Sequence, residues 1–257
     1  MKSATILILI LILLPALAWA ETMTDTKDLA LPADGIDTLV INCGAGSLNL
    51  RGSSKGGKIQ IAARIEVEEI GESDFREFVQ NNVRLSLQKR GNKAILQSEI
   101  KPPAGQNKDA RINLTIEFPE TIDVDIIDGS GSINVNNLRA NLKIDDDTGS
   151  IKIKNISGDV RIEDSSGSIA IEEITGDLIV IDGSGSITIE SVRGDLNIKD
   201  GSGSLTIEEI DGNVTMSDGS GSIDIRDVNK NVFIVIRAEG SGIVEVEGVK
   251  GKVTIRP

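Results

Sequence analysis

Residues 185–202 read GSITIESVRGDLNIKDGS, and variants of this stretch recur at a fixed period of eighteen residues. A constant period of this length is typical of a solenoid, in which each repeat forms one coil and equivalent residues stack on one another. The period is clearest in six aspartates, each followed by a Gly/Ser-rich turn: Asp128, Asp146, Asp164, Asp182, Asp200 and Asp218.

Apolar residues within one repeat predict two short strands. Ile187 and Ile189 alternate in the first half, Leu196 and Ile198 alternate in the second, and Val192 lies at the bend between them. Alternation points such side chains to one face of a strand, and β-branched residues suit that surface. A hexapeptide coil also spans eighteen residues, but its sixth positions should be apolar. They are polar here: Arg139, Ser157, Thr175, Arg193, Asp211 and Asn229. We therefore predict an all-β fold, a parallel β-solenoid (β-helix) with 18-residue, two-strand coils.

The chain divides into four predicted segments. Residues 1–20 are typical of a secretory signal peptide, because Lys2 precedes an apolar run that ends in Ala18-Trp19-Ala20, a small-x-small cleavage site. The same run could be an uncleaved anchor, but it is shorter than the ~20 residues of a membrane span. We expect a flexible segment over 21–36, a β-rich lead-in and solenoid cap over 37–120, and the repeats over 121–257. The product would be exported to the periplasm, the cell surface or the medium, with no membrane span after cleavage.

The lead-in is less regular than the repeats. Alternating patterns predict strands over 58–69, 83–88, 94–99 and 111–118. Residues 73–80 are predicted to form one short helix, with Ser73 as its N-cap and with Phe75 and Phe78 on one face. We expect this region to cover the open end of the solenoid, which would otherwise expose unpaired backbone groups.

Composition excludes several classes of function. The chain contains no histidine, which is the commonest general base near neutral pH, so Ser-His-Asp and Cys-His catalytic centres are excluded. The single cysteine, Cys43, cannot form an intrachain disulfide, and we interpret it as a small buried apolar residue. A net charge of -13 repels nucleic acid and anionic membranes.

The six aspartates are the candidate metal ligands. Carboxylates about 5 Å apart repel one another by ~1 kcal/mol in water and more where the dielectric is lower. They must therefore be splayed into solvent, partly protonated or bridged by cations. Calcium is the one cofactor that this column suggests. In the calcium-binding β-roll, however, the aspartate follows the glycines, whereas here it precedes them, so we favour capping of each turn by its own aspartate.

Four outward positions break the polar pattern of the repeats. Ile179, Ile181, Phe233 and Val235 stand where other repeats carry polar residues. They are candidate partner-contact residues, since exposed apolar side chains can mark an interface. Packing of the predicted helix, or local variation of the core, is the alternative explanation, and we favour it.

Two further segments carry a family resemblance. These are the Leu-x-Ile-x-x-Gly-x-Gly-Ser-Leu-x-Leu stretch at 39–50 and the Ile-x-Phe-Pro-Glu stretch at 116–120. Together with the tandem Gly-Ser-Ile repeats, they resemble the bacterial adhesin-like domain of unknown function. The resemblance implies an exported or envelope-associated β-solenoid without established enzymatic activity.

Two functions from different classes follow. The leading hypothesis is a non-catalytic, adhesin-like scaffold or binding module of the bacterial envelope, whose partner is an unidentified envelope protein or glycan. The alternative is a polysaccharide-acting β-helix enzyme that uses paired aspartate carboxylates. Such enzymes need loops of unequal length to form a cleft, and the six consecutive repeats contain no insertion.

Overall fold

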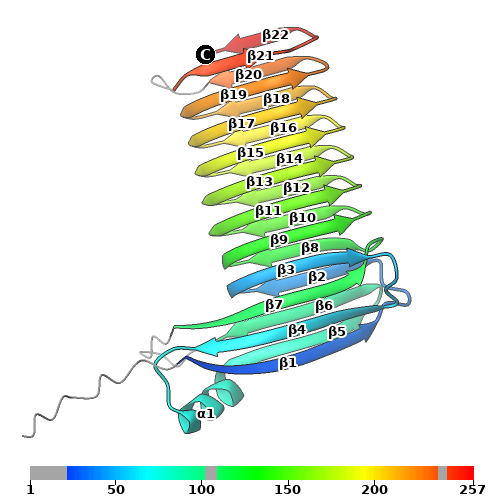
Figure 1. The fold of residues 1–257 in the computed structure, drawn as a ribbon, viewed down its shortest axis with the longest axis vertical. Helices are drawn as coiled ribbons and strands as arrows, with labels where there is room; N and C mark the ends of the chain where they lie inside the picture. Colours follow the sequence, from blue (N-terminus) through cyan, green and yellow to red (C-terminus); the bar gives the residue numbers. More distant parts are fainter. Residues whose placement is uncertain (1–21, 102–108, 237–241) are drawn as a thin grey trace, which may run out of the picture.

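The structure is a computed structural model that describes residues 22–101, 109–236 and 242–257. The predicted signal peptide therefore lies outside the described residues. The described chain forms a flattened solenoid of two facing 11-stranded sheets (Figure 1). This architecture confirms the predicted fold class.

Sheet A and sheet B are named here by their strands. Sheet A has the order β1 (Met23–Pro32), β4 (Lys58–Val67), β7 (Ala110–Pro119), β3 (Ala45–Ser53), β9 (Ser130–Leu138), β11 (Gly149–Ile156), β13 (Gly167–Ile174), β15 (Gly185–Val192), β17 (Gly203–Ile210), β19 (Gly221–Val228) and β21 (Val244–Glu247). Sheet B has the order β22 (Val253–Arg256), β20 (Val232–Ile236), β18 (Val214–Asp218), β16 (Leu196–Asp200), β14 (Leu178–Asp182), β12 (Val160–Asp164), β10 (Leu142–Asp146), β8 (Asp123–Asp128), β2 (Thr38–Cys43), β6 (Lys93–Ile100) and β5 (Val83–Arg90).

Successive coils stack in strict register. Ile187 of β15 pairs with Ile169 of β13, eighteen residues earlier, and both side chains are at most 1% exposed. The same register holds in sheet B, where Leu196 of β16 pairs with Leu178 of β14. Each coil buries too little apolar surface to fold alone, so its stability depends on its neighbours.

One residue per coil breaks the alternation of sheet A. Ser191, with φ 60°, adopts the left-handed conformation, and five equivalents do the same: Asn137, Asn155, Glu173, Glu209 and Asp227. Ile189 and Val192 are three residues apart, so a strictly alternating strand would point them to opposite faces. Because the chain turns at Ser191, both side chains enter the core.

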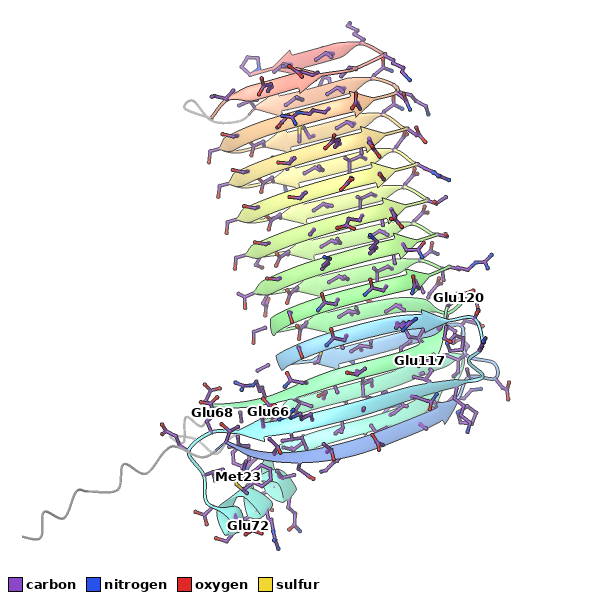
Figure 2. The ribbon with its side chains drawn as sticks, in the orientation of Figure 1. Met23, Glu66, Glu68, Glu72, Glu117 and Glu120 are labelled. Carbon is purple, nitrogen blue, oxygen red and sulfur yellow. The ribbon has the colours of Figure 1, made fainter. Side chains whose placement is uncertain are left out.

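The lead-in extends both sheets at the N-terminal end of the rod. In sheet A, β4 is antiparallel to both of its neighbours, β1 and β7, and in sheet B β5 is antiparallel to β6. These strands agree with the predicted ones over 58–69, 83–88, 94–99 and 111–118. Arg111 of β7 forms ion pairs with Glu66 and Glu68, with N–O distances of 2.7 and 3.3 Å. Figure 2 shows these two glutamates close together at one end of the lead-in strands.

Helix α1 (Glu72–Asn82) lies beyond β1 and β5 at this end of the rod (Figure 1). Phe75, Phe78 and Val79 are buried against the core, as expected for one apolar face. The predicted cap is wrong, because the N-cap residue lies two positions before Ser73. Gly71 is the N-cap residue and makes no side-chain hydrogen bond, while the Ser73 hydroxyl donates to Asp74 instead.

Residues 21–36 also differ from expectation. Residues 23–32 form β1, which pairs along its whole length with β4 and is not a flexible tail. Leu29 and Leu31 of β1 pack against the core, and Met23 lies beside α1 (Figure 2). The partner of β1 lies more than 25 residues away in sequence, which is why local patterning does not reveal the pairing.

Candidate functional site

The six repeat aspartates form one column inside the rod, which we call the Asp ladder. Each is the last residue of a sheet B strand, and in β16 Asp200 follows Leu196 and Ile198 at the same alternating positions. Their side chains therefore point into the coil, and all six residues are at most 5% exposed. Splaying into solvent, one of the three arrangements considered above, is not how these carboxylates avoid one another.

Most of the ladder lacks conventional hydrogen-bond partners. Asp164 and Asp182 each accept a hydrogen bond from the amide two residues on, at 3.2 and 3.3 Å, which is the predicted turn cap. The other four have no hydrogen bond of normal geometry on either oxygen: Asp128, Asp146, Asp200 and Asp218. Their turn amides lie close enough to favour the charged form. Burial of these carboxyl groups nevertheless raises their pKa by more than the turn amides lower it.

Burial raises the pKa of the ladder carboxyls. It raises the pKa of Asp128, Asp146 and Asp164 to about 6, and that of Asp200 to about 7. The pKa values of Asp182 and Asp218 move in the same direction for the same reason. Desolvation is the largest cause throughout, and the charges of Asp182 and Asp218 add to it at Asp200. The ladder is therefore partly protonated near neutral pH.

Neighbouring rungs are close enough to affect one another's ionisation. The charge of Asp128 raises the pKa of Asp146, and the charge of Asp146 raises that of Asp164. At one end of the column Cys43 occupies the next position, and its thiol lies 3.8 Å from the Ile127 carbonyl oxygen. Burial raises the pKa of this thiol, so it stays neutral. The residue as a whole is half-buried, whereas the sequence predicted a buried one. At the other end Asp218 pairs with Ile236, and the ladder stops.

Calcium needs more oxygen atoms than two adjacent rungs supply. Ca²⁺ takes six to eight oxygen ligands. Within the described ranges, no three His, Cys, Asp or Glu side chains are grouped so that they could hold a metal ion. The geometry thus favours protons over calcium as the neutralising charge, and calcium binding by the ladder stays a prediction to be tested.

The test of calcium binding is thermal unfolding of the protein in calcium and in chelator. We expect the two midpoints to agree within about 1 °C, because a ligand that does not bind the native state cannot stabilise it. A calcium-dependent rise of several degrees, absent from an Asp200→Asn variant, would assign the ladder to calcium instead.

A second polar column has the opposite character. At the other end of the sheet B strands, Asp177 accepts a hydrogen bond from the backbone amide of Asp195 at 2.9 Å, and Asp195 accepts one from Asn213 at 2.8 Å. This exposed column links every coil from Asp123 to Lys252. Hydrogen bonding to Asn213 lowers the pKa of Asp195. These side chains cap turns across coils.

The four candidate contact residues lie on the outer face of sheet B. Ile179 and Ile181 belong to β14 and Phe233 and Val235 to β20, with β16 and β18 between the two pairs. All four are half-buried. Helix α1 lies at the far end of the rod and does not cover them (Figure 1). They form two small apolar areas, and the Arg256 guanidinium lies 5.4 Å from the centre of the Phe233 ring.

Sequence patterning missed Ile127 on the same face. It pairs with Asp145 in the column that also contains Ile181 and Val235, and it is 49% exposed. The eighteen-residue register could have revealed this outward position. Ile127 lies one residue before Asp128, just as Ile181 lies one residue before Asp182.

Comparison with known proteins places most of the chain in one family. The family model described as Toastrack DUF4097 matches residues 36–255. None of the curated proteins matches the chain. Within the part of the chain that the structure describes, no helix is long and apolar enough to cross a membrane.

Several solved structures resemble the chain at low identity. A putative adhesin from Bacteroides fragilis is 17% identical, with a TM-score of 0.46 over 91% of this chain and 96% of the other. A putative adhesin from Parabacteroides distasonis is 12% identical, with a TM-score of 0.44 over 91% and 97%. A putative lipid binding protein from Parabacteroides distasonis is 13% identical, with a TM-score of 0.46 over 91% and 96%.

Proposed function

The chain belongs to the Toastrack DUF4097 family, which confirms the resemblance noted from its sequence, and on that premise we propose that it is a non-catalytic, exported binding module of the bacterial envelope. The supporting observation is the shape of the coils. Two flat faces, one from each sheet, run the length of the rod and carry rows of side chains in register (Figure 2). Such a surface suits a partner that binds along several coils at once.

The burial of the Asp ladder supports a non-catalytic role. A glycoside hydrolase needs two carboxyl groups on either side of the scissile bond. Here the carboxylates that the enzymatic alternative would use are at most 5% exposed, so a polysaccharide cannot reach them. Sustained release of reducing ends from acidic or neutral polysaccharides by the purified protein would overturn the proposal.

We place the binding surface on the outer face of sheet B. This face carries Ile179, Ile181, Phe233 and Val235, and the equivalent columns of sheet A are polar or small, with Ala170, Glu172, Thr188 and Glu190 at the central coils. Half-buried apolar side chains on a flat sheet gain more from being covered by a partner than solvated carboxylates do.

The test is capture from envelope extracts with variants of each face. Ile179→Arg with Ile181→Glu restores the pair found one coil earlier, at Arg161 and Glu163, and should leave the fold intact. We expect this variant to lose a component that the wild type retains. Thr188→Arg on sheet A is the matched control and should retain it. Loss with both variants, or with neither, would contradict the assignment to sheet B.

A further inference from the structure

The last coil leaves its inner side chains open. Val253 and Ile255 of β22 occupy the same inward columns as Val232 and Ile234 of β20. They are 41% and 47% exposed, whereas Val232 and Ile234 are at most 1% exposed. Within the described ranges no residue lies beyond them, and β21 and β22 are the outermost strands of their sheets. An apolar end with two free strand edges is a surface that a further β-layer can cover.

Charge is segregated between the two edges of this coil. Glu245 and Glu247 are the outward residues of β21. The chain that leads into and forms β22 carries Lys250, Lys252 and Arg256 instead. The acidic edge therefore belongs to sheet A and the basic edge to sheet B. Each edge repels a copy of itself and attracts the other.

We propose that two copies of this chain join end to end through their last coils, with β21 of each copy pairing antiparallel to β22 of the other. The two-fold axis runs parallel to the strands, which exchanges sheet A and sheet B between the copies. An axis perpendicular to the sheets would place β21 against β21 and Glu against Glu. Only the first arrangement brings the acidic edge to the basic edge, and it does so twice. This inference goes beyond the proposed function and concerns a different surface.

The spacing of apolar residues sets the register. Directly opposite residues of an antiparallel pair point to the same face. Val244 therefore lies opposite the second copy's Ile255, and Val246 lies opposite its Val253, so that all four inner side chains of each copy are covered. The same register places Glu247 opposite the second copy's Lys252, and Glu245 diagonal to its Arg256.

Association stops at two copies because the ends of the rod differ. The N-terminal end carries α1, and Phe75 and Phe78 are already buried there. An isologous contact through the C-terminal end alone gives a closed dimer and not a filament.

The test is sedimentation of the purified full chain at micromolar concentrations. We expect a dimer for the wild type and a monomer for Ile255→Glu, with the dissociation constant of the dimer raised at least about tenfold. Because Ile255 is nearly half exposed in a single copy, this variant should melt within a few degrees of the wild-type monomer. A monomeric wild type, or a dimeric Ile255→Glu, would overturn the proposal.

A charge swap distinguishes the two axes. Glu247→Lys and Lys252→Glu should each weaken the dimer, and the double variant should restore it, since the pair is exchanged but remains complementary. If the two-fold axis were instead perpendicular to the sheets, β21 would face β21, and like charges would still meet in the double variant. Failure of the double variant to recover would therefore refute the pairing of β21 with β22.

Discussion

The midpoint of thermal unfolding should be roughly 10 °C lower at pH 8 than at pH 5, because the Asp ladder must ionise inside the rod at the higher pH. Each raised pKa of about 6 or 7 stands some two units or more above the ordinary value of 3.8. One unit corresponds to ~1.4 kcal/mol, and the rungs titrate together, so the total effect is several kcal/mol. For a domain of this size, 1 kcal/mol moves the midpoint by ~2 to 4 °C.

The direction follows from proton binding. Between the ordinary pKa and the raised one, the folded protein holds protons that the unfolded chain releases, so its stability falls as the pH rises from about 4 to about 7 and then levels off. Groups with lowered pKa values, such as Glu172 beside Lys154 and Asp195 beside Asn213, lose their contribution only at more acidic pH. At pH 5 the ladder is therefore the dominant titrating element.

An Asp200→Asn variant isolates this effect. The amide fills the same place without charge, so the midpoint should rise at pH 8, change little at pH 5 and vary less across the range. Asp195→Asn is the matched control on the exposed column, where the carboxylate already accepts a hydrogen bond from the Asn213 amide, and it should not raise the midpoint at pH 8. Equal wild-type midpoints at pH 5 and pH 8 would contradict the protonated ladder.

Gly185→Ala should destabilise the protein by about 4 kcal/mol or more, which is among the largest effects of a single methyl group. Gly185 has φ 147°, a conformation that residues with a side chain avoid, and an added Cβ would lie 1.6 Å from the carbonyl oxygen of Gly167 in the preceding coil. The two coils would have to separate at that corner, which breaks the parallel pairing of β13 with β15.

Chemical unfolding measures the loss, and Gly44→Ala provides the comparison. An added Cβ at Gly44 meets nothing within 4 Å, so the free energy of unfolding should change by no more than ~0.5 kcal/mol. If Gly185→Ala unfolds at the same denaturant concentration as the wild type, the stacking distance between these corners is not what the structure shows.

The eighteen-residue period was enough to predict the repeat architecture, because stacking converts periodicity directly into contacts. It also contained the burial of the Asp ladder, since Asp200 continues the alternation of Leu196 and Ile198. The Gly/Ser residues after each aspartate suggest only a turn cap. The alternation in the strand before each aspartate is what indicates that its side chain points into the rod. The break at Ser191 was likewise encoded in the three-residue step from Ile189 to Val192.

Other features had no local signal. The pairing of β1 with β4 depends on contacts between distant segments, and the residues of β1 are mostly polar or only partly buried. The left-handed positions are occupied by Asn, Glu, Ser and Asp, so residue type does not reveal them. Counting coils is enough to separate the pair Ile179 and Ile181 from the pair Phe233 and Val235. The sequence does not show whether the helix covers these residues, because that depends on where the helix lies in space.

The strict register between coils makes the length of the rod adjustable by evolution. Deleting one eighteen-residue unit, such as residues 167–184, would place Ile187 directly next to Ile151 in the same column, and duplicating the unit would also keep the columns in register. Both changes leave the termini as they are. The distance between the two ends would change by ~4.8 Å for each unit. The length of the rod can thus change with the number of repeats, while the surfaces at its two ends stay the same.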